Sequence, residues 1–289
     1  MTDIISHFAL HLAIKVLPMK PAVLAFVILL LTANRISGQQ PYWQQDLRYS
    51  ITVTLDDRNH SLDGSLTLNY LNHSPDTLRN IWFHLWPNAY KNDRTALSDQ
   101  LLENGETAFY FSDPADRGYI NNLDFRVNGN TARTQDHPSD IDILNVLLPS
   151  PLYPGDSVTI TTPFHVKLPR NYSRGGHRGQ QYSITQWYPK PAVYDAKGWH
   201  TMPYLDQGEF YSEFGTYDVK ITLPQDYVVA ATGELQDTAE MGWMLRTRNS
   251  PVSSQQSAVS RQNATGKGLI MSVMQDRDAE WVIFLCRRR

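Results

Sequence analysis

Histidine, carboxylate and aromatic side chains gather in residues 183–215, SITQWYPKPAVYDAKGWHTMPYLDQGEFYSEFG. A histidine with nearby carboxylates can bind zinc or exchange protons. A noncontiguous metal site could use His177, His200 and an acid such as Asp206 or Glu209. The chain contains neither an H-E-x-x-H nor an H-x-H motif, however. Local spacing therefore does not support a metal site, and the sequence predicts no metal ligand.

A carboxylate pair is the next possible catalytic arrangement. Glu209 and Glu213 are four residues apart, which on a strand separates them by about 13 Å. The two glycosidase mechanisms use separations of roughly 5 to 9.5 Å, so a complete enzyme with this acid pair is disfavoured. Alternation with Phe210 and Phe214 predicts instead that both glutamates face solvent. The chain also lacks the G-x-S-x-G motif of serine hydrolases, and we predict no catalytic residue.

The glycine-rich stretch GGHRG, residues 175–179, could be taken for a phosphate cradle. It matches neither G-x-G-x-x-G nor a Walker loop, and it precedes a predicted strand where a phosphate cradle precedes a helix. The pattern favours a mobile loop.

The aromatic side chains of residues 183–215 allow two interpretations. Tryptophan and tyrosine can be packing residues of an edge strand, because they bury large apolar areas while their polar ends reach water. They can also form the wall of a cleft, since Gln186, Lys190 and His200 would add a few polar groups to the stacking surfaces.

The elements around this stretch are strands with period-two alternation. Apolar side chains alternate with polar ones from Tyr49 to Leu55 and again from Leu62 to Tyr70, which predicts a hairpin. Further strands are expected at 78–86, 119–127, 143–148, 156–168, 213–223 and 227–235, separated by turns rich in Asn, Gly and Pro. One short helix fits Thr95–Glu103. The pattern predicts an all-β fold, an antiparallel β-sandwich.

Composition and the N-terminus limit the partners. The net charge is -3 with the two signs interspersed, so nothing indicates a nucleic-acid partner, and a single cysteine allows no internal disulfide. Residues 22–33 form a twelve-residue apolar run after Lys20, shorter than the about 20 residues that span a membrane. Residues 1–38 therefore read as a signal peptide, and we expect an exported protein, periplasmic, at the cell surface or secreted, with no membrane span after cleavage.

The runs TQWYPKPAVYD (185–195), GWH (198–200), PYLDQGEFYSEFGTYDVKITLP (203–224) and YVVAATGEL (227–235) resemble the N-terminal domain of the aminopeptidase N, or membrane alanyl aminopeptidase, family of zinc metallopeptidases. The similarity is strongest to its secreted forms in Bacteroidetes-type bacteria and extends over roughly residues 42–237. It implies a saddle-shaped β-sandwich that packs on a thermolysin-like catalytic domain.

The resemblance also implies roles for three residues. The family element T-Q-x-E/Q lines the pocket for the substrate amine and falls on residues 185–188, so Gln186, Trp187 and Tyr188 are the implied substrate-binding residues. Tyr188 stands where the family has an acidic or amide residue, although its ring or hydroxyl could still contact a cation.

The family's zinc motif H-E-x-x-H is absent from these 289 residues. We therefore expect residues 39–240 to be a non-catalytic domain truncated before the catalytic domain, inactive alone and without a cofactor. Its peptide substrate would be reached through the missing domain, and zinc belongs to the full-length family. Residues 241–289, rich in Ser, Gln and Asn at 248–268, are predicted to be a flexible or aberrant tail. The alternative is an independent exported β-sandwich that binds peptide or glycan through the aromatic stretch.

Overall fold

A computed structural model describes residues 42–224, 227–238, 241–242, 245, 267–276 and 283–287. The predicted signal peptide, residues 1–38, lies outside the described residues. Among the described helices, none is both long enough and apolar enough to cross a bilayer.

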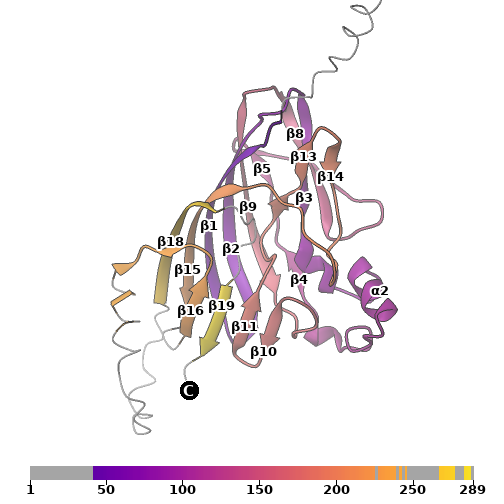
Figure 1. The fold of residues 1–289 in the computed structure, drawn as a ribbon, viewed down its shortest axis with the longest axis vertical. Coiled ribbons are helices and arrows are strands. Elements are labelled where there is room, and N and C mark those ends of the chain that lie inside the picture. Colours follow the sequence, from indigo (N-terminus) through magenta and orange to yellow (C-terminus); the bar gives the residue numbers. More distant parts are fainter. Residues whose placement is uncertain are drawn as a thin grey trace, which may run out of the picture. The chain divides into compact units, whose positions relative to one another are not determined.

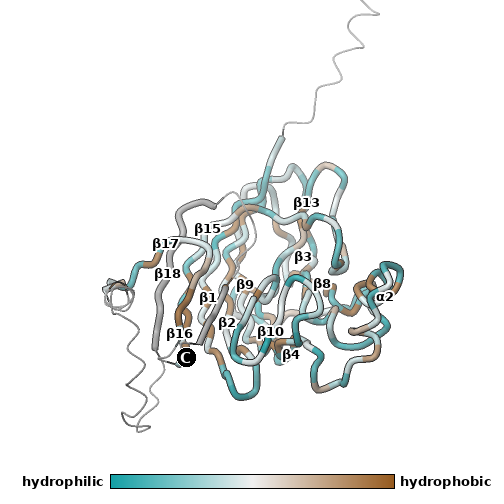
Figure 2. Tube along the Cα trace, turned by 60° about the horizontal axis from the view of Figure 1, so that its bottom comes forward, coloured by the Kyte–Doolittle hydropathy of each residue, from teal (hydrophilic) through white to brown (hydrophobic). Residues whose placement is uncertain are grey.

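The predicted N-terminal hairpin is confirmed. Strands β1 (Asp46–Asp56) and β2 (Ser61–Leu71) pair antiparallel over their whole lengths, with Tyr49 opposite Leu68. Their side chains alternate between buried and exposed, as period-two sequences do when one sheet face covers a core. The same alternation of hydropathy is visible along these strands in Figure 2.

A large twisted sheet is built around this hairpin (Figure 1). In the part of the chain that the structure describes it has nine strands, in the order β17-β18-β15-β1-β2-β9-β5-β6, with β4 also paired to β9. All neighbours in it are antiparallel except β1 and β15, which run parallel with Tyr49 opposite Tyr217. Its remaining strands are β4 (Tyr119–Asn121), β5 (Arg126–Val127), β6 (Asn130–Thr131), β9 (Ser157–Lys167), β15 (Gly215–Leu223), β17 (Glu234–Leu235) and β18 (Lys267–Asp276).

Two of the predicted strands are broken. The stretch 119–127 forms the short strands β4 and β5, separated by Asn122 with a φ of 59°, a left-handed conformation that interrupts a strand. The stretch 227–235 likewise forms two strands in two different sheets, β16 (Tyr227–Ala231) and β17.

Two smaller sheets complete the sandwich. One has the order β12-β3-β8-β7 and the other β10-β11-β19-β16. A separate hairpin joins β13 (Val193–Asp195) to β14 (Gly198–His200). The strands of the two small sheets not yet given are β3 (Leu78–His84), β7 (Thr134–Asp136), β8 (Ile143–Leu152), β10 (Gly176–Arg178), β11 (Gln181–Ile184), β12 (Lys190–Pro191) and β19 (Ile283–Arg287).

One hydrophobic core connects the three sheets. Its buried members come from the large sheet (Ile51, Ile160), from the β3–β8 sheet (Phe83) and from the β11–β19 sheet (Ile184, Ile283). The inner face of the large sheet therefore packs on the two smaller ones, and the all-β, predominantly antiparallel sandwich is confirmed.

The predicted helix is confirmed as α2 (Ala96–Glu103), capped by the side chain of Thr95, whose Oγ1 accepts from the Ser98 N–H. It packs with the 3₁₀ turn η1 (Trp86–Tyr90) in a second buried cluster that includes Leu97, Leu101 and Tyr204. A further 3₁₀ turn, η2, spans Pro114–Asp116. Helix and turn therefore form a small unit at one edge of the sandwich (Figure 1).

Strands β18 and β19 lie within residues 241–289, which the composition predicts to be a flexible or aberrant tail. β18 pairs antiparallel with β15, and β19 pairs with both β11 and β16. These ten- and five-residue segments are thus strands of the sheets, while 246–266 lie outside the described residues. The domain boundaries at 38 and 240 stay predictions.

Candidate functional site

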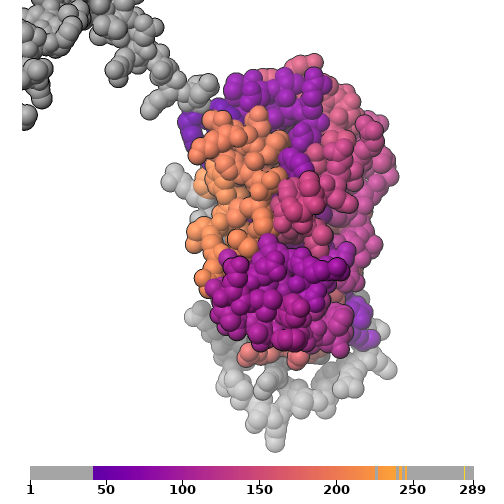
Figure 3. Space-filling model, turned by 90° about the vertical axis from the view of Figure 1, so that its right-hand side faces the viewer, coloured from indigo at the N-terminus to yellow at the C-terminus, as the bar shows by residue number. Residues whose placement is uncertain are grey.

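The aromatic stretch, residues 183–215, crosses the sandwich and then runs beside α2. After the β13–β14 hairpin, residues 201–214 have no regular strand or helix. Side chains fix this segment in place: Gln100 donates to the Gln207 carbonyl (3.1 Å) and accepts from its N–H (2.8 Å), and Trp86 donates to the Met202 carbonyl (3.1 Å). Figure 3 shows this segment, in orange, next to the purple region around α2 on the same face.

Gln186, Trp187 and Tyr188, the predicted substrate-binding residues, are all buried. Their exposed fractions are 4%, 1% and 2%. Gln186 accepts from the Lys190 ammonium (3.1 Å), and the Tyr188 hydroxyl donates to that of Tyr217 (3.1 Å). The Trp187 ring belongs to the main core. In the described structure these three side chains therefore pack, and their contact with a substrate stays a prediction.

Gln186 has a φ of 51°. A residue with a side chain rarely adopts this left-handed conformation, which costs of order 1–3 kcal/mol and persists only where the surroundings impose it. Strained residues of this kind cluster at functional sites.

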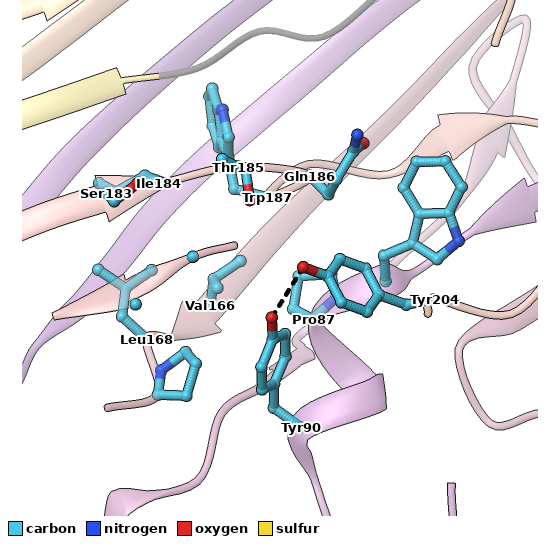
Figure 4. A pocket seen from close by; sticks show the side chains of 14 residues that line it. Pro87, Tyr90, Val166, Leu168, Ser183, Ile184, Thr185, Gln186, Trp187 and Tyr204 are labelled. Carbon is cyan, nitrogen blue, oxygen red and sulfur yellow. Dashed lines mark hydrogen bonds between the residues drawn. The ribbon is translucent and has the colours of Figure 1, made fainter. Parts of the chain in front are cut away.

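A small cavity lies against Gln186 (Figure 4). Its volume is about 20 Å³, which is room for about one water molecule. Across from Gln186 and Trp187, the Tyr90 hydroxyl donates to that of Tyr204 (2.9 Å). The cavity is too small for a peptide side chain, so this part of the chain holds no ready-made substrate pocket.

A cationic and aromatic cluster adjoins the cavity. The Lys190 ammonium lies 5.3 Å from the centre of the Trp86 ring and 5.4 Å from that of Tyr188, within the range of cation–π attraction. His84 stacks on Trp86 with ring centres 4.4 Å apart, and its Nε2 accepts from the Met202 N–H. Burial, and then the Lys190 charge, lower the pKa of His84 to about 3. This histidine is therefore neutral at physiological pH and serves to hold residue 202.

Two buried carboxyl groups belong to or contact the segment of residues 201–214. Asp142 is 3% exposed and accepts from the Tyr204 N–H (2.7 Å). Glu213 is 4% exposed, so the prediction that it faces solvent is wrong, because residues 211–214 form no strand and the expected alternation does not apply to them. Glu209 is exposed, as predicted. Burial raises the pKa of both Asp142 and Glu213 to about 7.

The candidate metal ligands are not brought together. His200 Nε2 lies 2.8 Å from Asp195, the His177 ring stacks on His60, and the Asp206 carboxylate accepts from Ser173 (2.6 Å). Among the described residues, no three His, Cys, Asp or Glu side chains are arranged to hold an ion. Within the described part of the chain, His177, His200 and Asp206 are therefore not arranged as a zinc site.

Sequence reasoning missed Asp142 and the packing role of His84. Asp142 lies in the polar stretch SDID ahead of β8, which reads as an exposed turn. The only available signal for His84 is its place at the end of the apolar strand β3.

Comparisons with known proteins give solved structures only. No family model and no curated protein matches the chain. It is similar to M1 zinc metallopeptidase from Deinococcus radiodurans, in a mutant form bound to a Tyr-Ser-Ala substrate, at 15% identity and a TM-score of 0.43, over 83% of this chain and 42% of that one. It is similar to yeast LTA4 hydrolase in complex with bestatin at 9% identity and a TM-score of 0.43, over 89% of this chain and 32% of that one.

The first of these neighbours is described as a zinc metallopeptidase. The chain spans less than half the length of each of them.

Proposed function

We propose that this chain is a non-catalytic N-terminal domain that forms one side of the substrate cleft of an exported zinc aminopeptidase-like protein. The zinc and the groups that cleave the peptide would come from a catalytic domain outside these 289 residues. Support comes first from the specific run of family-like sequence between Thr185 and Leu235.

The observation that carries the proposal is the backbone at Gln186. It sits in the middle of the family-like T-Q element, holds a left-handed φ of 51° and lies at the wall of the cavity. An ordinary packing residue gains nothing from such strain, whereas a residue that must present its peptide group in one orientation does. The Lys190 bond to Gln186 and the Tyr188–Tyr217 bond supply the support that keeps this geometry.

Tyr188 limits what the cleft can recognise. Its hydroxyl is already bonded to Tyr217, and its ring faces the Lys190 ammonium. A tyrosine also has no carboxylate with which to bind a substrate ammonium group. The strength of amine recognition would therefore depend on the catalytic domain.

The purified 289-residue chain tests the non-catalytic part. We expect no stoichiometric zinc by metal analysis and no cleavage of aminoacyl chromogenic substrates with zinc added, because the described acids and histidines form no ion site. One tightly bound zinc per chain, or turnover above buffer, would contradict it. The genomic DNA that follows the coding segment tests the other part: a reading frame with H-E-x-x-H is expected there.

A second candidate, an exported module that binds peptide or glycan, is favoured by two exposed aromatic rings. Tyr211 and Phe214 are 46% and 41% exposed on the aromatic stretch and offer stacking surfaces of the kind that bind sugars and peptides. Saturable binding of an oligosaccharide that is lost in Tyr211→Ala, with no metallopeptidase frame downstream, would favour it over the first.

A further inference from the structure

We propose that residues 169–179, a loop that leads into the short strand β10, form a binding site for a small oxyanion group, a phosphate or a carboxylate. The loop surrounds a surface hollow of about 260 Å³, lined by Arg170, Asn171, Tyr172, His177, Arg178 and Gly179. This hollow is separate from the cavity at Gln186 and shares none of its lining residues. The inference does not depend on the proposed function.

The backbone of the hollow is preformed. The two arms of the loop are bonded to each other, by the His177 N–H to the Pro169 carbonyl (2.9 Å) and the Asn171 N–H to the His177 carbonyl (3.3 Å). A Cβ atom at Gly176 would lie 2.7 Å from the carbonyl oxygens of Pro169 and Arg170, so the arms approach as closely as only glycine allows. A ligand would therefore meet a shaped surface without first ordering it.

His177, which lines the hollow, is stacked on a second imidazole ring. The His177 ring lies 3.7 Å from that of His60, at an angle of 13°. His60 is bonded through Nδ1 to the Tyr182 hydroxyl (2.8 Å), and the His177 Nδ1 donates to the Gly179 carbonyl (3.2 Å). The stacking and the hydrogen bond therefore restrain the orientation of the His177 ring.

Two arginine side chains at the hollow have unused hydrogen-bond donors. Arg178 is exposed, and within the part of the chain that the structure describes it has no ion pair or hydrogen bond from its side chain. Arg170 makes one ion-pair contact, from Nη1 to Asp116 (3.2 Å), which leaves most of its N–H donors unused. Two guanidinium groups with free donors are the groups that bind phosphate and carboxylate oxygens bidentately.

Charged side chains near His177 also favour an anionic ligand. The pKa of His177 is lowered to about 4, by burial first, then by interaction with the His60 ring and, to a smaller extent, by the charges of Lys167 and Arg170, while the hydrogen bond to Gly179 opposes the shift. Lys167 and Arg170 thus place positive charge near the His177 ring, which favours an anion.

Isothermal titration calorimetry on the full chain tests the site, with sodium phosphate and sodium acetate titrated separately at constant ionic strength. We expect saturable binding of phosphate, and a rise in the pKa of His177 by NMR when phosphate is bound, because a nearby negative charge favours the imidazolium. Stronger binding of phosphate than of acetate would assign the site to tetrahedral anions, and equal binding would assign it to carboxylate groups as well.

Arg178→Gln should weaken phosphate binding at least about tenfold, the factor that about 1.4 kcal/mol represents. Arg48→Gln is the matched control, because Arg48 is also exposed and lies on β1 with Asp46 as its partner; it should bind phosphate as the unmodified chain does. The proposal is overturned if neither anion binds saturably into the tens of millimolar, or if Arg178→Gln and Arg48→Gln bind equally well.

Discussion

Truncation of Trp187 to alanine separates the two interpretations of the aromatic stretch. If the ring lined an open cleft, its removal would change the free energy of unfolding little. The structure gives it an exposed fraction of 1% and places it between Phe164, with ring centres 6.0 Å apart, and Tyr188, 5.1 Å apart. Burial of this kind makes a Trp→Ala change cost about 3–5 kcal/mol.

The neighbours decide where in that range the loss falls. The new void would join the existing cavity of about 20 Å³, and Tyr188 is held away from it by its bond to Tyr217. Because the site can collapse only partly, we expect the upper half of the range. That is about a quarter or more of the 5–15 kcal/mol by which a typical domain is stable.

Urea unfolding of the full chain, followed by far-UV circular dichroism, measures this loss without relying on tryptophan fluorescence. The control is Trp199→Ala, because Trp199 is only partly buried against the edge of the core, with Tyr194 4.9 Å away; it should cost about 1 kcal/mol. If Trp187→Ala costs no more than Trp199→Ala, the ring is not core and the burial argument fails.

Two further predictions concern the segment beside α2. Burial raises the pKa of Glu213 and of Asp142 to about 7, so the folded state holds these protons more tightly than the unfolded state. The stability that the two protonated carboxyl groups contribute is complete below pH 4, falls as the pH rises and is lost above about pH 7. Urea melts across pH 4–8 should show this decline, and Glu213→Gln should make it shallower; an unchanged slope would argue against the buried carboxyl. Tyr204→Phe removes the acceptor of the buried Tyr90 hydroxyl (2.9 Å) and should lower the free energy of unfolding by about 1–3 kcal/mol. The control Tyr153→Phe, at a ring 56% exposed, should change it hardly at all in the same melts. Equal losses in the two variants would refute the role of the Tyr90–Tyr204 bond.

Local pattern predicted much of the sandwich. The alternation from Tyr49 to Tyr70 predicted both strands of the hairpin and the turn between them. Their antiparallel pairing was also predictable, because two strands joined by a short connection pair with each other. Thr95 marked the start of α2, since a threonine side chain can cap the first turn.

Long-range pairing was not predictable in the same way. Nothing in the sequence of β1 indicates that its second neighbour is β15, because residues far apart in the chain carry no shared local signal. The burial of Glu213 was missed for a related reason: alternation predicts exposure only inside a strand, and residues 211–214 are held by contacts with other segments.

The exposure of the predicted substrate-binding residues Gln186, Trp187 and Tyr188 was not predictable, and their role stays a prediction. Sequence cannot tell a ring in a cleft from a ring in a core when both need the same aromatic residue. Burial of Trp187 and Tyr188 follows from Phe164 and Tyr217, which belong to strands far away in the sequence.

The parallel pairing of β1 with β15 has a kinetic consequence. Tyr49 lies opposite Tyr217, so about 168 residues separate the partners, and β1 can complete its pairing only after β15 exists. At roughly 5–20 residues per second of synthesis, that interval is on the order of ten to thirty seconds. During it the nascent hairpin presents one unpaired edge of β1, the kind of edge on which strands of other chains add. Contacts between such distant segments also slow folding itself, so a chain released early is the species most prone to aggregate.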